Sequence, residues 1–305
     1  MDGKAHDAGL YIGWERGKHS LPCHGVLAEM RLGSNPNRTK QADQFTPVVL
    51  TVVTHLPNLK GYHQHRMEVV QTCLRTMRDN SGGDYTVIVW DNGSCEEFRS
   101  WVRNEYKPDT FIESVNMGKT LARNTLARML SPETIMTYAD DDILFMPNWL
   151  QPQMDLLKTF PKVACVTGYP VRTQFRWGCE LTKAWGADCG KMQAGRYIPE
   201  KWEHDFAVSI GRDPDWHIEH TKDDIDYVVE WQGLKAYATS HHCQFIGYAG
   251  TIAKAHKLDM AAMGEEKTFD IKLDSLGLRL ATIERLTRHM GNVIDDELRA
   301  DMEAV

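Results

Sequence analysis

Five apolar segments alternate with amphipathic ones between residues 47 and 166. Each apolar segment has the length and the β-branched or aromatic content of a strand, and most of them lack charge, which predicts strands buried within a sheet. The predicted strands are 48–53, 86–90, 111–115, 134–139 and 163–166. Between the first two, Met67, Val70, Leu74 and Met77 recur at helical spacing, so a helix covers the sheet. The alternation of strand and helix predicts a parallel, doubly wound α/β sheet.

Local signals place the starts of two further helices. Ser94 and Glu97 have the spacing of a capping box, which predicts a helix that begins at Ser94. Pro147 and Asn148 are predicted to open the helix before the fifth strand.

The segments outside this alternating region are less regular. Residues 1–46 are rich in Gly, His, Asn and charge and lack sustained periodicity, so we interpret them as an N-terminal extension. Residues 47–166 form one predicted half of a domain and residues 167–305 the other. Tryptophans among Gly, Arg and Asp mark 170–220 as an irregular segment that lines a cleft or anchors the packing.

Composition narrows the class of protein. The chain has 305 residues and a net charge of −7, which argues against a nucleic-acid binder with a general basic surface. No apolar run approaches the length of a membrane span, and the N-terminus lacks a signal-peptide pattern, so we expect no integral membrane segment. The seven cysteines are scattered without CxxC spacing, which favours a reducing, cytoplasmic location.

Three consecutive carboxylates, Asp140, Asp141 and Asp142, follow the fourth predicted strand. Adjacent like charges cost free energy unless water or a cation offsets them. Ligands of α/β folds bind at the carboxyl ends of strands, and carboxylate oxygens favour hard divalent cations. The pattern therefore predicts a metal-carboxylate site, and its alternative is a solvated acidic turn.

An ordered set of segments resembles the family 2 glycosyltransferases, which have the GT-A fold. The segments are 49–54, 89–94, 116–119, 122–124, 140–142 with Pro147, 245–248, 264–266, 277–280 and 289–292. The resemblance implies a Rossmann-like, mostly parallel central sheet flanked by helices, with an irregular acceptor-side half. It also implies transfer of a sugar from a nucleotide-diphosphate donor to the hydroxyl of an unknown acceptor.

The resemblance implies roles for the residues of the donor half. The family's Asp-x-Asp motif maps to Asp140 and Asp142, with Mn²⁺ or Mg²⁺ on Asp142 and Asp140, and Asp140 also near the ribose. The triplet leaves open a shifted register that involves Asp141. Further nucleotide-sugar contacts are expected from Thr54 and Asp91 at the base and from Lys119 and Arg123 at the phosphates; the alternative role of Asp91 is to cap its turn.

The acceptor half must supply the base that an inverting transfer requires. The resemblance favours Glu266 and then Glu265, whereas Asp223 and Asp224 form a competing acidic cluster. The family more often has Glu-Asp at the position where this chain has Glu-Glu.

The resemblance makes His289 the third metal ligand, through a neutral ring nitrogen. His241 and His242 are alternatives, and we interpret His217 and His220 as acceptor-site or surface residues. Two other functions stay open at this point: a nucleotidyltransferase, which would release pyrophosphate, and a carbohydrate-binding module that keeps the fold without turnover.

Overall fold

The structure is a computed structural model that describes residues 47–189, 191–255 and 266–303. The described residues all lie in one compact unit, Thr46–Val305. The predicted extension at 1–46 therefore falls outside the described residues, as does Glu265.

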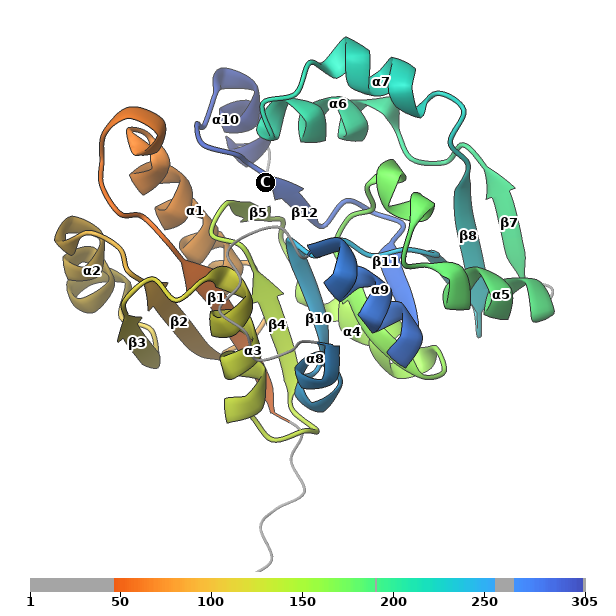
Figure 1. Ribbon diagram of the computed structural model, residues 1–305, viewed down its shortest axis with the longest axis horizontal. Helices are drawn as coiled ribbons and strands as arrows, with labels where there is room; N and C mark the ends of the chain where they lie inside the picture. The colour runs from red at the N-terminus through yellow and green to blue at the C-terminus, as the bar shows by residue number, and fades with distance from the viewer. Residues whose placement is uncertain (1–46, 190, 256–265, 304–305) are drawn as a thin grey trace, which may run out of the picture. The chain divides into compact units, whose positions relative to one another are not determined.

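A ten-stranded sheet forms the centre of the described residues, in the order β3-β2-β1-β4-β10-β6-β11-β9-β8-β7 (Figure 1). Its strands are β1 (Val48–Thr54), β2 (Thr86–Asn92), β3 (Thr110–Ser114), β4 (Ile135–Ala139), β6 (Val163–Thr167), β7 (Met192–Gly195), β8 (Asp226–Trp231), β9 (Leu234–Tyr237), β10 (Gln244–Tyr248) and β11 (Leu278–Thr282). The helices are α1 (Arg66–Asp79), α2 (Glu96–Trp101), α3 (Lys119–Met129), α4 (Leu150–Thr159), α5 (Glu180–Asp188), α6 (Glu200–Ser209), α7 (Pro214–Thr221), α8 (Ala249–Ala255), α9 (Glu266–Leu276) and α10 (Asp296–Glu303). The α/β fold class is thus confirmed.

Strand β1 shows how the two faces of the sheet are covered. Alternate side chains of a strand point to opposite faces. Leu50 and Val52 belong to the apolar cluster that contains the buried face of α1. Val49 and Val53 belong to the second cluster, with the buried residues of α3. Apolar burial on both faces explains why the run at 48–53 carries no charge.

The sheet is parallel on one side and mixed on the other. Strands β3, β2, β1 and β4 pair in parallel, as the alternation of strand and helix predicts. Strand β6 does not lie beside β4, because β10 is inserted between them and runs antiparallel to both. The segment after residue 166 therefore contributes to the centre of the sheet.

A second, two-stranded sheet lies after the acidic triplet. It consists of β5 (Ile143–Phe145) and β12 (Thr287–His289), which pair antiparallel with His289 opposite Ile143. The strands predicted from the sequence do not include the segment 143–145. Its three side chains are buried, and pairing with β12 satisfies backbone groups that a buried turn would leave unpaired.

Two predicted helix starts are wrong by a few residues. Helix α2 begins at Glu96 with Cys95 as its N-cap, and the Ser94 hydroxyl instead accepts from the backbone N–H of Leu56 at 2.9 Å. Helix α4 begins at Leu150, after Asn148 in a left-handed conformation with φ of +57°. In both cases the residues predicted to begin the helix instead take part in a tertiary contact or a turn.

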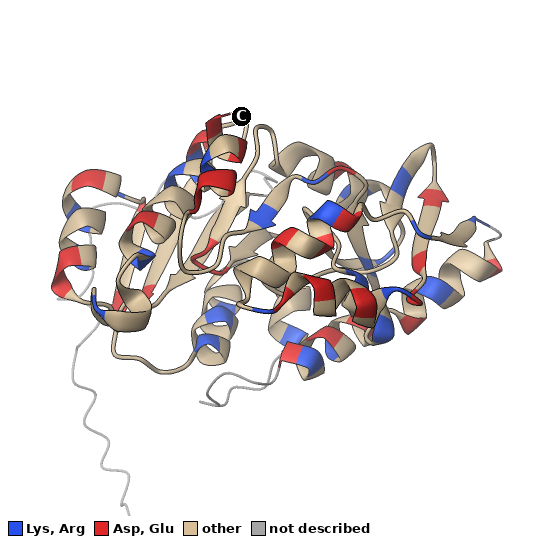
Figure 2. Cartoon of the chain, turned by 90° about the horizontal axis from the view of Figure 1, so that it is seen from above, with Lys and Arg blue, Asp and Glu red and all other residues tan. Residues whose placement is uncertain are grey.

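Acidic and basic residues are interspersed along most of the described helices (Figure 2). Within the described ranges, no helix combines the length and apolarity needed to cross a membrane.

Candidate functional site

The acidic triplet lies at the carboxyl end of β4, where the adjacent loop of β10 fixes its backbone. The N–H of Asp140 donates to the carbonyl of Cys243 at 2.8 Å. The N–H of Met290 donates to the carbonyl of Asp142 at 2.7 Å. Segments more than 100 residues away in the sequence therefore hold both ends of the triplet.

Each carboxylate of the triplet has a different cationic environment. Asp140 accepts from the Lys119 ammonium at 2.7 Å and from the Tyr138 hydroxyl at 2.8 Å. Asp141 pairs with Arg66 and accepts from the backbone N–H of His55 at 2.9 Å. Burial raises the pKa of Asp141 above its ordinary value, although Arg66 opposes this effect.

Asp142 and His289 meet through the pairing of β5 with β12. The Nε2 of His289 lies 3.5 Å from Oδ1 of Asp142, while its Nδ1 is 2.9 Å from the Ser209 hydroxyl. That Oδ1 is buried without a hydrogen-bond partner, whereas Oδ2 accepts from Arg66 at 2.9 Å. Burial acts to raise the pKa of Asp142, but His289 and Arg66 outweigh it and hold the pKa below its ordinary value.

These donors fit a hard divalent cation. An unpartnered carboxylate oxygen beside an imidazole nitrogen, with a second carboxylate two residues earlier, is a donor set suited to Mn²⁺. The hydroxyl of Ser209 contacts Nδ1 of His289 and thereby orients Nε2 toward Asp142.

Lys119, Arg123 and Glu266 form an ion-pair cluster next to Asp140. Glu266 accepts from Arg123 at 2.9 Å, and its other oxygen is 3.3 Å from the Lys119 ammonium. Burial acts to raise the pKa of Glu266, but Arg123 and Lys119 outweigh it and hold that pKa well below its ordinary range. The predicted base therefore lies within reach of the triplet through Lys119.

A cleft of about 700 Å³ opens beside the triplet, within the size range of small-molecule sites. The three aspartates of the triplet line it, together with Arg66 and Lys119. His55, Asn92 and Asn116 also line it, although the sequence analysis did not select them. His55 and Asn92 each lie at the end of a parallel strand, which is the signal that could have identified them.

Three predicted nucleotide contacts are buried and do not line the cleft. Thr54 is buried, and its hydroxyl donates to the Trp90 carbonyl at 3.3 Å. Asp91 is buried and accepts from the Ser94 N–H at 2.9 Å and from Arg99 Nε at 2.7 Å, so it caps its turn. Arg123 is buried beneath Glu266, with its guanidinium 4.0 Å from the ring centroid of Phe269.

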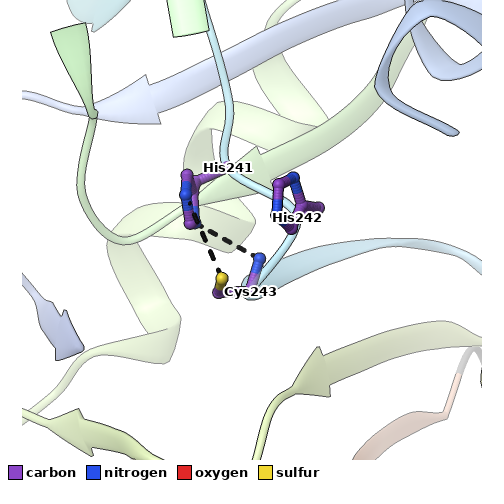
Figure 3. A group of neighbouring side chains, drawn as sticks. All are labelled: His241, His242 and Cys243. Carbon is purple, nitrogen blue, oxygen red and sulfur yellow. Dashed lines mark hydrogen bonds between the residues drawn. The ribbon is translucent and has the colours of Figure 1, made fainter. Parts of the chain in front are cut away.

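His241, His242 and Cys243 are the residues just before β10, and Figure 3 shows them side by side. One potential ligand atom from each lies within 4.8 Å of the others. The N–H of Cys243 donates to Nδ1 of His241 at 3.3 Å, and Nδ1 of His242 is 2.9 Å from Asp270. Burial lowers the pKa of His241 well below its ordinary value, which keeps its ring neutral.

Asp224, His217 and His220 take part in ion pairs or hydrogen bonds within residues 167–305. Asp224 pairs with Arg176, which also contacts His220. His217 is buried with Nε2 at 2.9 Å from Glu203. The contacts of these residues are thus with their own half, whereas Glu266 shares Lys119 with Asp140.

Residues 64–212 match the family model described as glycosyl transferase family 2. The match covers just under half of the chain, so residues 64–212 are similar to the glycosyl transferase family 2 domain. A search of curated proteins found no match.

Three solved structures are similar over part of the chain. GalNAc-T7 with UDP, GalNAc and Mn²⁺ is 11% identical, with 83% of this chain and 46% of that chain covered and a TM-score of 0.44. Mannosyltransferase PcManGT from Pyrobaculum calidifontis with GDP-Man and Mn²⁺ is 23% identical, with coverages of 45% and 41% and a TM-score of 0.34. S. aureus TarS 1-349 is 13% identical, with coverages of 40% and 34% and a TM-score of 0.30. The chain thus spans less than half the length of each, and likenesses with such TM-scores do not bear on its function.

Proposed function

We propose that this chain transfers a sugar, with inversion, from a nucleotide-diphosphate donor to an acceptor hydroxyl and uses Mn²⁺ or Mg²⁺. The observation that carries the proposal is the unpartnered Oδ1 of Asp142, 3.5 Å from Nε2 of His289, at the end of a buried strand. In this proposal Asp142, Asp140 and His289 hold the cation. The cation would neutralise charge that develops on the departing diphosphate.

The residues around the cleft suit a nucleotide diphosphate. Lys119 borders the cleft and already pairs with a carboxylate, so it can exchange that partner for phosphate oxygens. Asn92 and Asn116 line the same cleft and offer amide donors and acceptors to a base or ribose. Thr54, Asp91, Arg123 and Asp141 remain proposed nucleotide-sugar residues. Asp141 lines the cleft, whereas the other three are buried and would act by positioning residues that line it.

Glu266 is the proposed base, and its ion pairs explain how the donor would activate it. A diphosphate that attracts Lys119 would remove one of the cations that hold the pKa of Glu266 low. Glu266 would then take the proton of the acceptor hydroxyl. The hydroxyl oxygen forms a bond to the anomeric carbon as the bond from that carbon to the diphosphate oxygen breaks.

A reducing, cytoplasmic location is also proposed. The described cysteines, including the exposed Cys189, are free thiols, which suits such a compartment.

The test is a thermal-shift panel of nucleoside diphosphates, each with and without Mn²⁺. A diphosphate at 100 times its Kd should stabilise the fold by about 2.7 kcal/mol. The stabilisation should require Mn²⁺ and should be lost in Asp142→Asn. If Asp142→Asn keeps the Mn²⁺-dependent shift, the metal assignment is wrong.

Product analysis separates the alternatives. Release of free nucleoside diphosphate from a donor supports glycosyl transfer, whereas pyrophosphate would indicate a nucleotidyltransferase. Sugar binding without turnover over a broad donor panel would indicate a binding module.

A further inference from the structure

The guanidinium of Arg66 bridges the acidic triplet and the segment that follows β12. Arg66 is the first residue of α1, and its side chain is 10% exposed. Its Nη1 donates to Oδ2 of Asp142 at 2.9 Å, to the Gly291 carbonyl at 3.2 Å and to Oδ1 of Asn292 at 3.1 Å. Its Nη2 pairs with Asp141.

This arrangement places the positive charge of Arg66 against two carboxylates of the triplet. Asp141 and Asp142 are adjacent and largely buried, so their charges are costly without an opposing charge. Arg66 occupies Oδ2 of Asp142 and leaves Oδ1, beside His289, without a partner. A divalent ion on the Asp142 carboxylate would lie close to Nη1, and the two cations would repel each other.

We propose that Arg66 is a built-in competitor of the divalent cation, which gives up Asp142 when the cation binds and keeps its pair with Asp141. The proposal rests on the proposed function, because it takes Asp142 as a metal ligand. The released Nη1 borders the same cleft and is a suitable donor to a phosphate oxygen. The chain then binds bare Mn²⁺ weakly and binds Mn²⁺ with a nucleoside diphosphate far more tightly.

The experiment measures the Kd for Mn²⁺ alone by calorimetry and by the electron paramagnetic resonance signal of free Mn²⁺. Arg66→Met should bind Mn²⁺ at least tenfold more tightly than the wild type, and Arg66→Lys should fall between them. The control is Arg75→Met, which removes the same charge from the exposed face of α1, where Arg75 lies 5.5 Å from the Trp101 ring centroid. Its Kd should change less than twofold.

A milder variant covers the case in which Arg66→Met does not fold. Asn292→Ala removes one acceptor of Nη1 without altering any carboxylate, and it should tighten Mn²⁺ binding two- to fivefold. With the nucleoside diphosphate present, the Mn²⁺ affinities of Arg66→Met and the wild type should differ much less. In the wild type, Arg66 has then released Asp142.

The outcomes distinguish the two proposals. Equal Mn²⁺ affinity in wild type, Arg66→Met and Asn292→Ala, with binding abolished by Asp142→Asn, overturns the competition and leaves the proposed function standing. Equal gains in Arg66→Met and Arg75→Met also overturn it, because they indicate a general charge effect. Mn²⁺ binding that is indifferent to Asp142→Asn overturns the metal site itself.

Discussion

Gly291 offers a test of how the segment after β12, which follows the proposed metal ligand His289, is held in place. Its φ is +76°, a left-handed conformation, and an added Cβ would overlap the backbone carbonyl oxygen of Ser209. The left-handed conformation costs an alanine about 1–2 kcal/mol. Forcing a methyl group against backbone adds about 1–3 kcal/mol. Gly291→Ala should therefore lower the free energy of unfolding by about 2–5 kcal/mol.

The matched control is Gly233→Ala, in the turn between β8 and β9. Gly233 has a φ of +83°, and nothing lies within 4 Å of an added Cβ. The control therefore carries the conformational cost alone, about 1–2 kcal/mol. The effect of alanine on the unfolded chain is similar at the two sites and cancels in the comparison.

Urea unfolding of both variants measures the difference, and Mn²⁺ titration links it to the site. The hydroxyl of Ser209 contacts Nδ1 of His289, so a displaced Ser209 should also weaken Mn²⁺ binding in Gly291→Ala. Gly233→Ala should bind Mn²⁺ as the wild type does. Equal losses of stability in the two variants would refute the reasoning that the Ser209 contact matters.

Two further predictions concern charged groups. Glu266→Gln should lower kcat by about 10²-fold or more while the nucleoside diphosphate still binds; unchanged kcat would exclude Glu266 as the base. Because the folded pKa of Glu266 is depressed, its ion pairs stabilise the wild type above the ordinary value of 4.5, and the difference in unfolding free energy from Glu266→Gln should shrink as the pH falls below that value. Arg172→Met should lower the free energy of unfolding, measured in urea, by about 3–5 kcal/mol. The substitution leaves the buried carboxylate of Asp226, which accepts from Arg172 Nε at 2.9 Å, without that opposing charge. Mn²⁺ affinity should stay unchanged in Arg172→Met, and a variant as stable as the wild type would contradict this burial argument.

The local signals in the sequence predict the donor half well. Val48–Thr54 and Ile135–Ala139 have charge-free runs because both faces of each strand are covered, so the pattern alone identifies them. The acidic triplet at the end of the second run is then placed at a sheet edge by general geometry.

Long-range pairing explains what the sequence could not predict. Strand β10 looks like any short apolar run, and nothing local indicates that it enters between β4 and β6. Arg66 resembles an ordinary solvated arginine at a helix start, yet it reaches Asp141, 75 residues further along. The proposal that His289 is a metal ligand comes only from the family resemblance, and its place beside Asp142 depends on the β5–β12 register.

The β5–β12 pairing has a consequence for biosynthesis. A ribosome releases the acidic triplet well before it makes residues 287–289, so the nascent chain holds Asp142 without its histidine partner until residue 289 has been made. Premature termination before residue 287 would leave the parallel strands complete and the proposed metal-ligand set short of one member.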